Sequence, residues 1–127
     1  MKQSKIIKKI HMAFKKFNGN VNFDSSTNKY RLKNHISLKY IASKYFKETI
    51  GTETSNGTLR IFHYSKNPTK TYELMDDVEE FLHDKVIDGL EYNISMHIQS
   101  PNLDSNGKLY EAVVDYSVKI RECKTII

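Results

Sequence analysis

The chain has 127 residues, of which 39% are hydrophobic and 28% are charged, and this composition is typical of one globular domain. Its single cysteine excludes an intramolecular disulfide and a cysteine-based zinc site, and it favours a reducing, cytoplasmic location. The longest apolar runs have two or three residues, whereas a membrane-spanning helix needs about 20. We therefore expect a soluble protein without a membrane span.

Charge is distributed unevenly along the chain. Residues 1–50 contain twelve basic and two acidic residues, a net charge of +10, whereas residues 51–127 contain eight basic and thirteen acidic residues, a net charge of −5. The total of +5 conceals this dipole. Lysine outnumbers arginine by 17 to 3, and isoleucine and asparagine are abundant, as AT-rich codons favour. We expect the gene to belong to a phage or mobile element with an AT-rich genome.

The first fifty residues predict two helices around a hairpin. Apolar residues recur every three or four positions over residues 4–17, which indicates an amphipathic helix. Residues 21–33 alternate on either side of a polar turn, which indicates a short hairpin. Residues 36–50 again show a helical stripe, and Gly51 stands where a helix commonly ends. That stripe consists of Leu38, Ile41, Ala42, Tyr45 and Phe46.

After a polar loop at residues 52–56, the chain predicts a strand and then a third helix. Residues 58–64 are rich in β-forming residue types. Residues 72–88 carry the clearest helical pattern, with Thr71 as a candidate N-cap and Gly89 at the end.

The C-terminal third predicts a β-hairpin. Residues 91–99 and 109–122 alternate between apolar and polar residues, as in antiparallel strands with one face in water. The apolar residues of the two strands share a face only if the numbers of paired residues add up to an even number. We therefore expect Ile98 to lie near Tyr110.

The predicted order is α-β-β-α-β-α-β-β, which indicates an α+β fold. We expect a two-layer sandwich with about three helices packed on one side of a mostly antiparallel sheet of about five strands. We also expect one compact domain over residues 1–127. Its parts are a basic helical and hairpin part at 1–50, the acidic helix and C-terminal hairpin at 51–122, and a short tail at 123–127.

The excess of lysine in the first fifty residues predicts a surface that contacts phosphates, because lysines attract a polyanion regardless of its sequence. A lysine-rich solvated face and a basic helix lying on a membrane surface are the alternatives. A helix-turn-helix over residues 36–64 is disfavoured, since Asn56 and Gly57 stand where its recognition helix belongs. The predicted nucleic-acid-binding residues are Lys5, Lys8, Lys9, Lys15, Lys16, Arg31, Lys33, Lys39, Lys44 and Lys47.

The third predicted helix is acidic, with seven acidic residues among sixteen. It is either a solvated face or a docking surface for a basic partner, since charge complementarity speeds association and sets specificity. The predicted partner-binding residues are Glu73, Asp76, Asp77, Glu79, Glu80, Asp84 and Asp88.

No motif identifies a catalytic or cofactor site. The five glycines are isolated, each at a predicted boundary or turn, which removes a phosphate-binding glycine loop. Glu80 and His83 have the Glu-x-x-His spacing of carboxylate-bridged metal sites, but the second copy that such sites need is absent from the sequence. His63 and His97, together with Asp115 or Glu111, are the remaining acid–base candidates. We expect no catalytic residue, no metal and no cofactor.

The sequence favours a small non-enzymatic binding protein that engages DNA or RNA, or a nucleic-acid-processing protein, through charged surfaces. The first alternative is an interaction or inhibitor module that docks through residues 72–88. The second alternative is a small metal-dependent nuclease. A homodimer is a further expectation, because it would bring the basic and acidic parts of two copies together.

Overall fold

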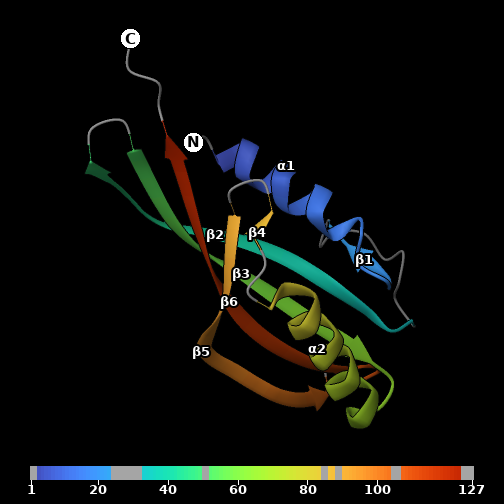
Figure 1. Cartoon of the computed structure of the whole chain (residues 1–127). Helices are drawn as coiled ribbons and strands as arrows, with labels where there is room; N and C mark the ends of the chain where they lie inside the picture. Colours follow the sequence, from blue (N-terminus) through green and yellow to red (C-terminus); the bar gives the residue numbers. More distant parts are fainter. Residues whose placement is uncertain are drawn as a thin grey trace.

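Strands dominate this computed structural model, which describes residues 3–23, 33–49, 52–83, 86–87, 90–103 and 107–123 (Figure 1). The elements in chain order are α1 (Gln3–Phe14), β1 (Val21–Asn22), β2 (His35–Thr49), β3 (Thr52–Ser65), α2 (Pro68–Leu82), β4 (Val86–Ile87), β5 (Leu90–Leu103) and β6 (Tyr110–Cys123). The strands form one sheet in the order β1-β2-β3-β6-β5-β4. β1 runs parallel to β2 and all other neighbours are antiparallel, so the fold is α+β with a mixed sheet.

Both described helices pack against one face of the sheet, which we call the helical face. Phe81 of α2 contacts Phe14 and Phe17, with ring centroids 5.3 and 5.4 Å apart, so the two helices also touch each other. The buried cluster between helices and sheet comprises Ile6, Ile10, Phe14, Phe17, Ile36, Leu59, Ile61, Val78, Leu82, Val114, Tyr116 and Val118. The opposite side of the sheet, which none of the described helices covers, is called the open face.

Alternation along β3 assigns side chains to these two faces. The odd-numbered residues from Gly57 to Ser65 are buried beneath the helices, whereas the even-numbered residues between them are partly exposed on the open face. β6 follows the same rule through its pairing with β3, since Leu59 lies opposite Tyr116 and Arg60 lies opposite Asp115.

The prediction of a helix over residues 36–50 is wrong, because this segment is strand β2. It pairs with β3 from His35 opposite Tyr64 to Thr49 opposite Thr52. The polar loop expected at residues 52–56 is likewise the first part of β3. The apolar stripe fits a helical period, but Ile36, Leu38 and Tyr40 also alternate with polar residues, and β-branched and aromatic residues favour a strand. The described residues therefore contain two helices rather than about three.

The first strand of the hairpin predicted over residues 21–33 does not pair as predicted. It is strand β1, which pairs in parallel with β2 and places Val21 opposite Ile36. The turn and second strand of that prediction, at residues 24–32, lie outside the described residues.

The acidic helix is confirmed, but α2 begins and ends earlier than the pattern indicates. Its N-cap is Asn67, whose Oδ1 accepts a hydrogen bond of 2.8 Å from the backbone N–H of Lys70. Pro68 follows at the start of the helix, where its missing N–H costs nothing. Thr71, the expected cap, is buried, and its hydroxyl donates to the carbonyl of Asn67.

The C-terminal hairpin is confirmed as β5 and β6. Ile98 pairs with Val114, four residues from the expected partner Tyr110. Because the offset is even, the backbone register keeps the predicted even sum of paired residue numbers up to the second irregularity, between Gln99 and Asn102.

His63 is fully buried on the helical face of β3. Its Nδ1–H donates to the backbone carbonyl of Ala112 at 3.1 Å, while Nε2 has no hydrogen-bond partner within the described structure. Desolvation lowers the pKa of His63 from 6.5 to about 4, against the smaller opposing effect of the Ala112 carbonyl. The ring is therefore neutral at physiological pH.

Gly57 lies in the middle of β3 and not at a turn, which corrects the expectation from sequence. A Cβ built on Gly57 would lie 2.5 Å from Cζ of Tyr40, closer than real Cβ contacts. Glycine is therefore required there because the ring of Tyr40 lies across the backbone of β3.

His63 should make the protein sensitive to acid. The unfolded chain binds a proton near pH 6.5 and the folded chain only near pH 4, so stability should fall as pH drops through this window. The loss should reach about 3 kcal/mol and level off below it. Urea unfolding of the wild type and of His63→Leu, measured from pH 7.5 to 3.5, checks this. The variant should lose less stability on acidification, and parallel curves would contradict the expectation.

Gly57→Ala should destabilise the protein by about 1–3 kcal/mol, because the added methyl displaces the Tyr40 ring. In a Tyr40→Leu background the same substitution should cost less, since the clashing ring atoms are gone. Unfolding midpoints for the four proteins of this double-mutant cycle measure the coupling. An equal cost in both backgrounds would show that Tyr40 is not the cause.

Candidate functional site

Helix α1 and the turn that follows it present a basic surface, defined here by Lys5 and Lys8 of the helix and Lys15 and Lys16 of the turn. All four side chains are exposed, on the side of the helix opposite its buried apolar residues. Lys9 is only partly exposed. No acidic residue occurs among residues 1–23 of the sequence. Two exposed lysines on the helix and two in the turn after it form a local positive surface without carboxylates on the same segment.

The other predicted lysines do not join this surface. Lys39 is exposed between Leu38 and Tyr40, which pack toward α1 and the core, so Lys39 lies on the open face. Lys33 is exposed immediately before β2. The ten-residue set predicted from sequence is thus divided between the two sides of the sheet. Arg31 lies outside the described residues, as do the side chains of Lys44 and Lys47.

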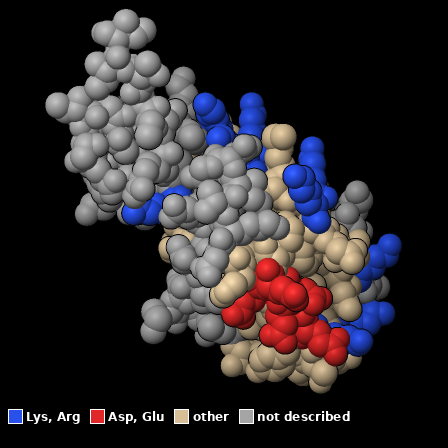
Figure 2. All heavy atoms as spheres, viewed as in Figure 1, with Lys and Arg blue, Asp and Glu red and all other residues tan. Residues whose placement is uncertain are grey.

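Helix α2 presents an acidic surface, which appears as a continuous patch in Figure 2. Its members, all exposed, are Glu73, Asp76, Asp77, Glu79 and Glu80. Nζ of Lys70 lies 3.4 Å from Oε2 of Glu73. Because both side chains are more than half exposed, this ion pair contributes little to stability. Tyr72 is 50% exposed beside the acidic residues. Asp84 and Asp88 lie outside the described residues.

The basic and acidic surfaces are neighbours on the same side of the molecule. Both helices pack on the helical face, and Phe81 of α2 contacts Phe14 of α1 beneath the two surfaces. In Figure 2 some basic side chains lie apart from the acidic patch and others border it. The basic and acidic residues that are separated along the sequence therefore also form separate surfaces on one side of the structure.

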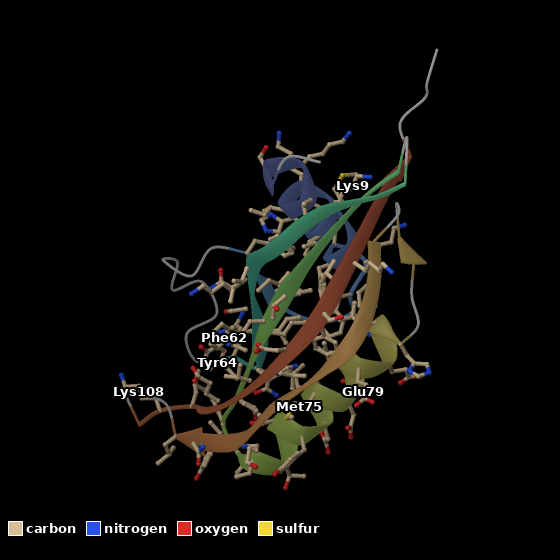
Figure 3. All side chains as sticks on the ribbon, turned by 90° about the vertical axis from the view of Figure 1, so that its left-hand side faces the viewer. Lys9, Phe62, Tyr64, Met75, Glu79 and Lys108 are labelled. Carbon is tan, nitrogen blue, oxygen red and sulfur yellow. The ribbon has the colours of Figure 1, made fainter. Side chains whose placement is uncertain are left out.

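The open face carries a row of aromatic rings that sequence reasoning missed. Phe62 and Tyr64 of β3 are partly exposed, and their rings are nearly parallel, 11° apart, with centroids separated by 6.4 Å (Figure 3). His35 of β2 stacks on Tyr64 at 4.8 Å and 23°. The signal was the alternation of Arg60, Phe62 and Tyr64, but it becomes informative only when the strand register and covered face are known.

A hydrogen bond holds the ring of His35 in this row. Its Nδ1–H donates to the carbonyl of Lys33 at 2.7 Å. Burial lowers the pKa of His35, and that carbonyl partly offsets the effect. The ring is consequently a neutral, fixed support for Tyr64.

Arg60 and Asp115 form a bidentate ion pair on the open face. Arg60 Nε and Nη2 donate to the two carboxylate oxygens of Asp115 at 2.8 and 3.0 Å. The hydrogen bonds and the negative charge raise the pKa of Arg60. The side chain of Arg60 is still 35% exposed, so the pair fixes the guanidinium plane without covering it.

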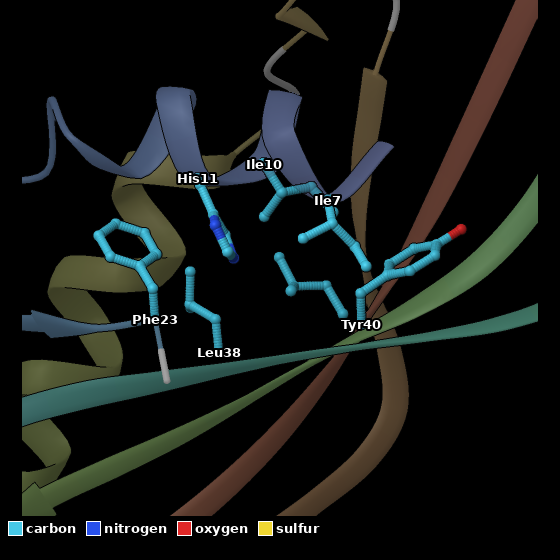
Figure 4. A pocket seen from close by; sticks show the side chains of 7 residues that line it. Ile7, Ile10, His11, Phe23, Leu38 and Tyr40 are labelled. Carbon is cyan, nitrogen blue, oxygen red and sulfur yellow. The ribbon is translucent and has the colours of Figure 1, made fainter. Parts of the chain in front are cut away.

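A small cavity of about 170 Å³ lies between α1 and the sheet (Figure 4). His11 projects into it and contacts Phe23, with ring centroids 4.7 Å apart. Burial, and to a lesser degree Lys15, lowers the pKa of His11. Its lining consists of Ile7, Ile10, His11, Phe23, Leu38, Tyr40 and Leu59. The cavity is smaller than typical ligand pockets of about 300–1,000 Å³, and its only lining side chains with polar atoms are His11 and Tyr40.

Among the acid–base candidates whose side chains the structure describes, His63 lies on the other face of the sheet from Asp115 and Glu111. His63 is buried on the helical face, whereas Asp115 pairs with Arg60 on the open face. The side chain of His97 lies outside the described residues. Glu80 and His83 are exposed on and after α2. Among the described residues, no three His, Cys, Asp or Glu side chains are grouped as a metal site requires.

Neither described helix is long and apolar enough to cross a bilayer. No known family model matches the chain, and no curated protein is significantly similar to it in sequence. The candidate sites are therefore the basic surface, the acidic surface and the aromatic row of the open face, and their chemistry alone indicates a function.

Proposed function

We propose that this protein binds nucleic acid without catalysing a reaction, in a reducing compartment such as the cytoplasm. The observation that carries the proposal is the exposure of the basic surface on α1, in a segment without acidic residues. Exposed lysines bind phosphates and release the counterions around them, which supplies most of the affinity of sequence-independent binding.

The position of α1 relative to β2 supports a path for the nucleic acid. Ile7 and Ile10 of α1 line the small cavity together with Leu38 and Tyr40 of β2, so the helix lies along this strand. Lys39 projects from the other side of the same strand. A strand of nucleic acid that crosses β2 would meet lysines on both sides of the sheet, whereas α2, with its acidic surface, packs on β3, β5 and β6.

Reversing Lys5, Lys8 and Lys15 to Glu should weaken binding and lower its salt dependence. Loss of about three phosphate contacts should reduce the slope of log K against log salt by roughly three units for duplex DNA. Fluorescence anisotropy with labelled oligonucleotides at roughly 50 and 200 mM salt measures both quantities. Reversal of Lys66 and Lys70, which are also exposed, is the control, and it is matched in charge to the double reversal of Lys5 and Lys8.

No binding at low salt by the wild type would overturn the proposal. So would an equal loss of affinity in the test and control variants, because binding would then depend on total charge and not on α1.

The alternative function is protein docking through the acidic surface. The exposed carboxylates of α2 and the half-exposed ring of Tyr72 favour it, since interfaces combine charge complementarity with aromatic anchors. The chain itself supplies a partner of matching chemistry, because a two-fold axis through the helical side would place each basic surface over the acidic surface of a second copy.

Self-association of this kind has a clear signature. A base-reversed variant (Lys5→Glu, Lys8→Glu, Lys15→Glu) and an acid-reversed variant (Asp76→Lys, Glu79→Lys) should each associate less than the wild type. An equimolar mixture of the two should form a 1:1 complex, because reversed charges again face each other. Sedimentation at low and high salt tests this. A wild type that stays monomeric at low salt, or a mixture that stays monomeric, would contradict it.

A further inference from the structure

The aromatic row on the open face lies across the centre of the sheet. β3 is flanked by β2 and β6, and Phe62 is paired with Ser37 on one side and Val113 on the other. Phe62 and Tyr64 are partly exposed on a face that the described helices leave uncovered. Two nearly parallel rings there form a surface onto which flat apolar groups can stack.

The rings are held in place before any ligand binds. His35 is only 7% exposed, and it stacks on the ring of Tyr64 while its own ring is fixed by the carbonyl of Lys33. Val113, 5% exposed, lies opposite Phe62 in the register. A preorganised site loses little side-chain entropy on binding, which favours affinity.

Charge on the open face is arranged asymmetrically about the rings. Lys39 is exposed on the β2 side, Lys33 is exposed two residues before β2, and Arg60 is held nearby by Asp115. Glu111 lies on the β6 side, opposite Tyr64, and Lys119, on the same face of β6, lies eight positions farther along the strand, opposite Asn56. An anionic backbone is therefore favoured along β2, with its attached flat groups directed over β3.

The spacing of the rings selects the form of nucleic acid. Their centroids are 6.4 Å apart, about twice the ~3.4 Å step between stacked bases along one strand of a duplex. Adjacent bases can each reach a ring only in an unstacked, extended strand. In a duplex both faces of every internal base are already stacked, so no base face is available.

We infer that the open face binds single-stranded nucleic acid, with two bases stacked on Phe62 and Tyr64 and the phosphates directed toward Lys33 and Lys39. This inference rests on the proposed nucleic-acid function and specifies the ligand and the second contact surface. Recognition is tolerant of sequence, because every base has a face that can stack. The site distinguishes single strands from duplexes through base accessibility and not through charge.

Three ligands of equal length separate stacking from charge: a single-stranded oligonucleotide, its duplex, and an abasic oligomer that keeps the sugar and phosphates. The wild type should bind the first most tightly. Phe62→Ala and Tyr64→Ala should each weaken binding of the single strand by roughly 5- to 150-fold. Their binding of the abasic oligomer and their salt slope should be unchanged, because no phosphate contact is removed.

Two further variants keep this test informative. Leu103→Ala removes an exposed apolar side chain of β5 and should leave binding unchanged. Phe62→Leu preserves an apolar side chain at the position but removes the ring, so a loss of binding with an unchanged melting temperature assigns the effect to stacking and not to unfolding.

The results distinguish failure of this inference from failure of the proposed function. Equal binding of single strand, duplex and abasic oligomer, or full binding by Phe62→Ala and Tyr64→Ala, would overturn the inference while nucleic-acid binding stands. No binding of any of the three ligands would overturn both. Loss of self-association in the ring variants, with oligonucleotide binding intact, would assign the open face to protein contact and overturn the inference.

Discussion

The pairing of β3 with β2 and β6 is the constraint on which the rest of the structure depends. It fixes the alternation that sends Leu59 and Ile61 under the helices and Phe62 and Tyr64 to the other side. The same register places Arg60 opposite Asp115 and Lys39 opposite Arg60. A shift by one residue would exchange the two faces, burying the charged residues and exposing the core. Strand register thus decides which side chains share a face of the sheet.

The sequence predicted an element correctly where its apolar residues fit only the helical period or only the strand period, and it failed where they fit both. Strict alternation identified β5 and β6, and the apolar stripe and acidic residues identified α2. β2 was mistaken for a helix because its apolar residues satisfy both periods over a short stretch, and only pairing with β3 decides between them. The Asn67–Pro68 pair marked the start of α2 more reliably than Thr71, since it combines a side-chain cap with a residue that needs no N–H bond.

The candidate sites could be predicted from sequence only where their residues are consecutive on one element. The lysines of α1 and the acidic residues of α2 are such cases, and the structure exposes most of them. The aromatic row could not be found in this way, because His35 and Tyr64 are 29 positions apart and meet only across the β2–β3 pairing. Conversely, Lys39 belongs to the basic half of the sequence but lies on the other side of the sheet from α1, which composition alone does not reveal.

Gly57 has a consequence for how the long β2–β3 hairpin forms. The ring of Tyr40 lies over the one position of β3 that has no side chain. If the two strands paired with a slip of two residues, the faces would still match, but the ring would meet Ser55 or Leu59 in place of glycine. Facial alternation alone does not discriminate against such even slips, whereas the fit of one ring on one glycine does. This contact therefore disfavours registers shifted by two residues and favours the native pairing of β2 and β3 during folding.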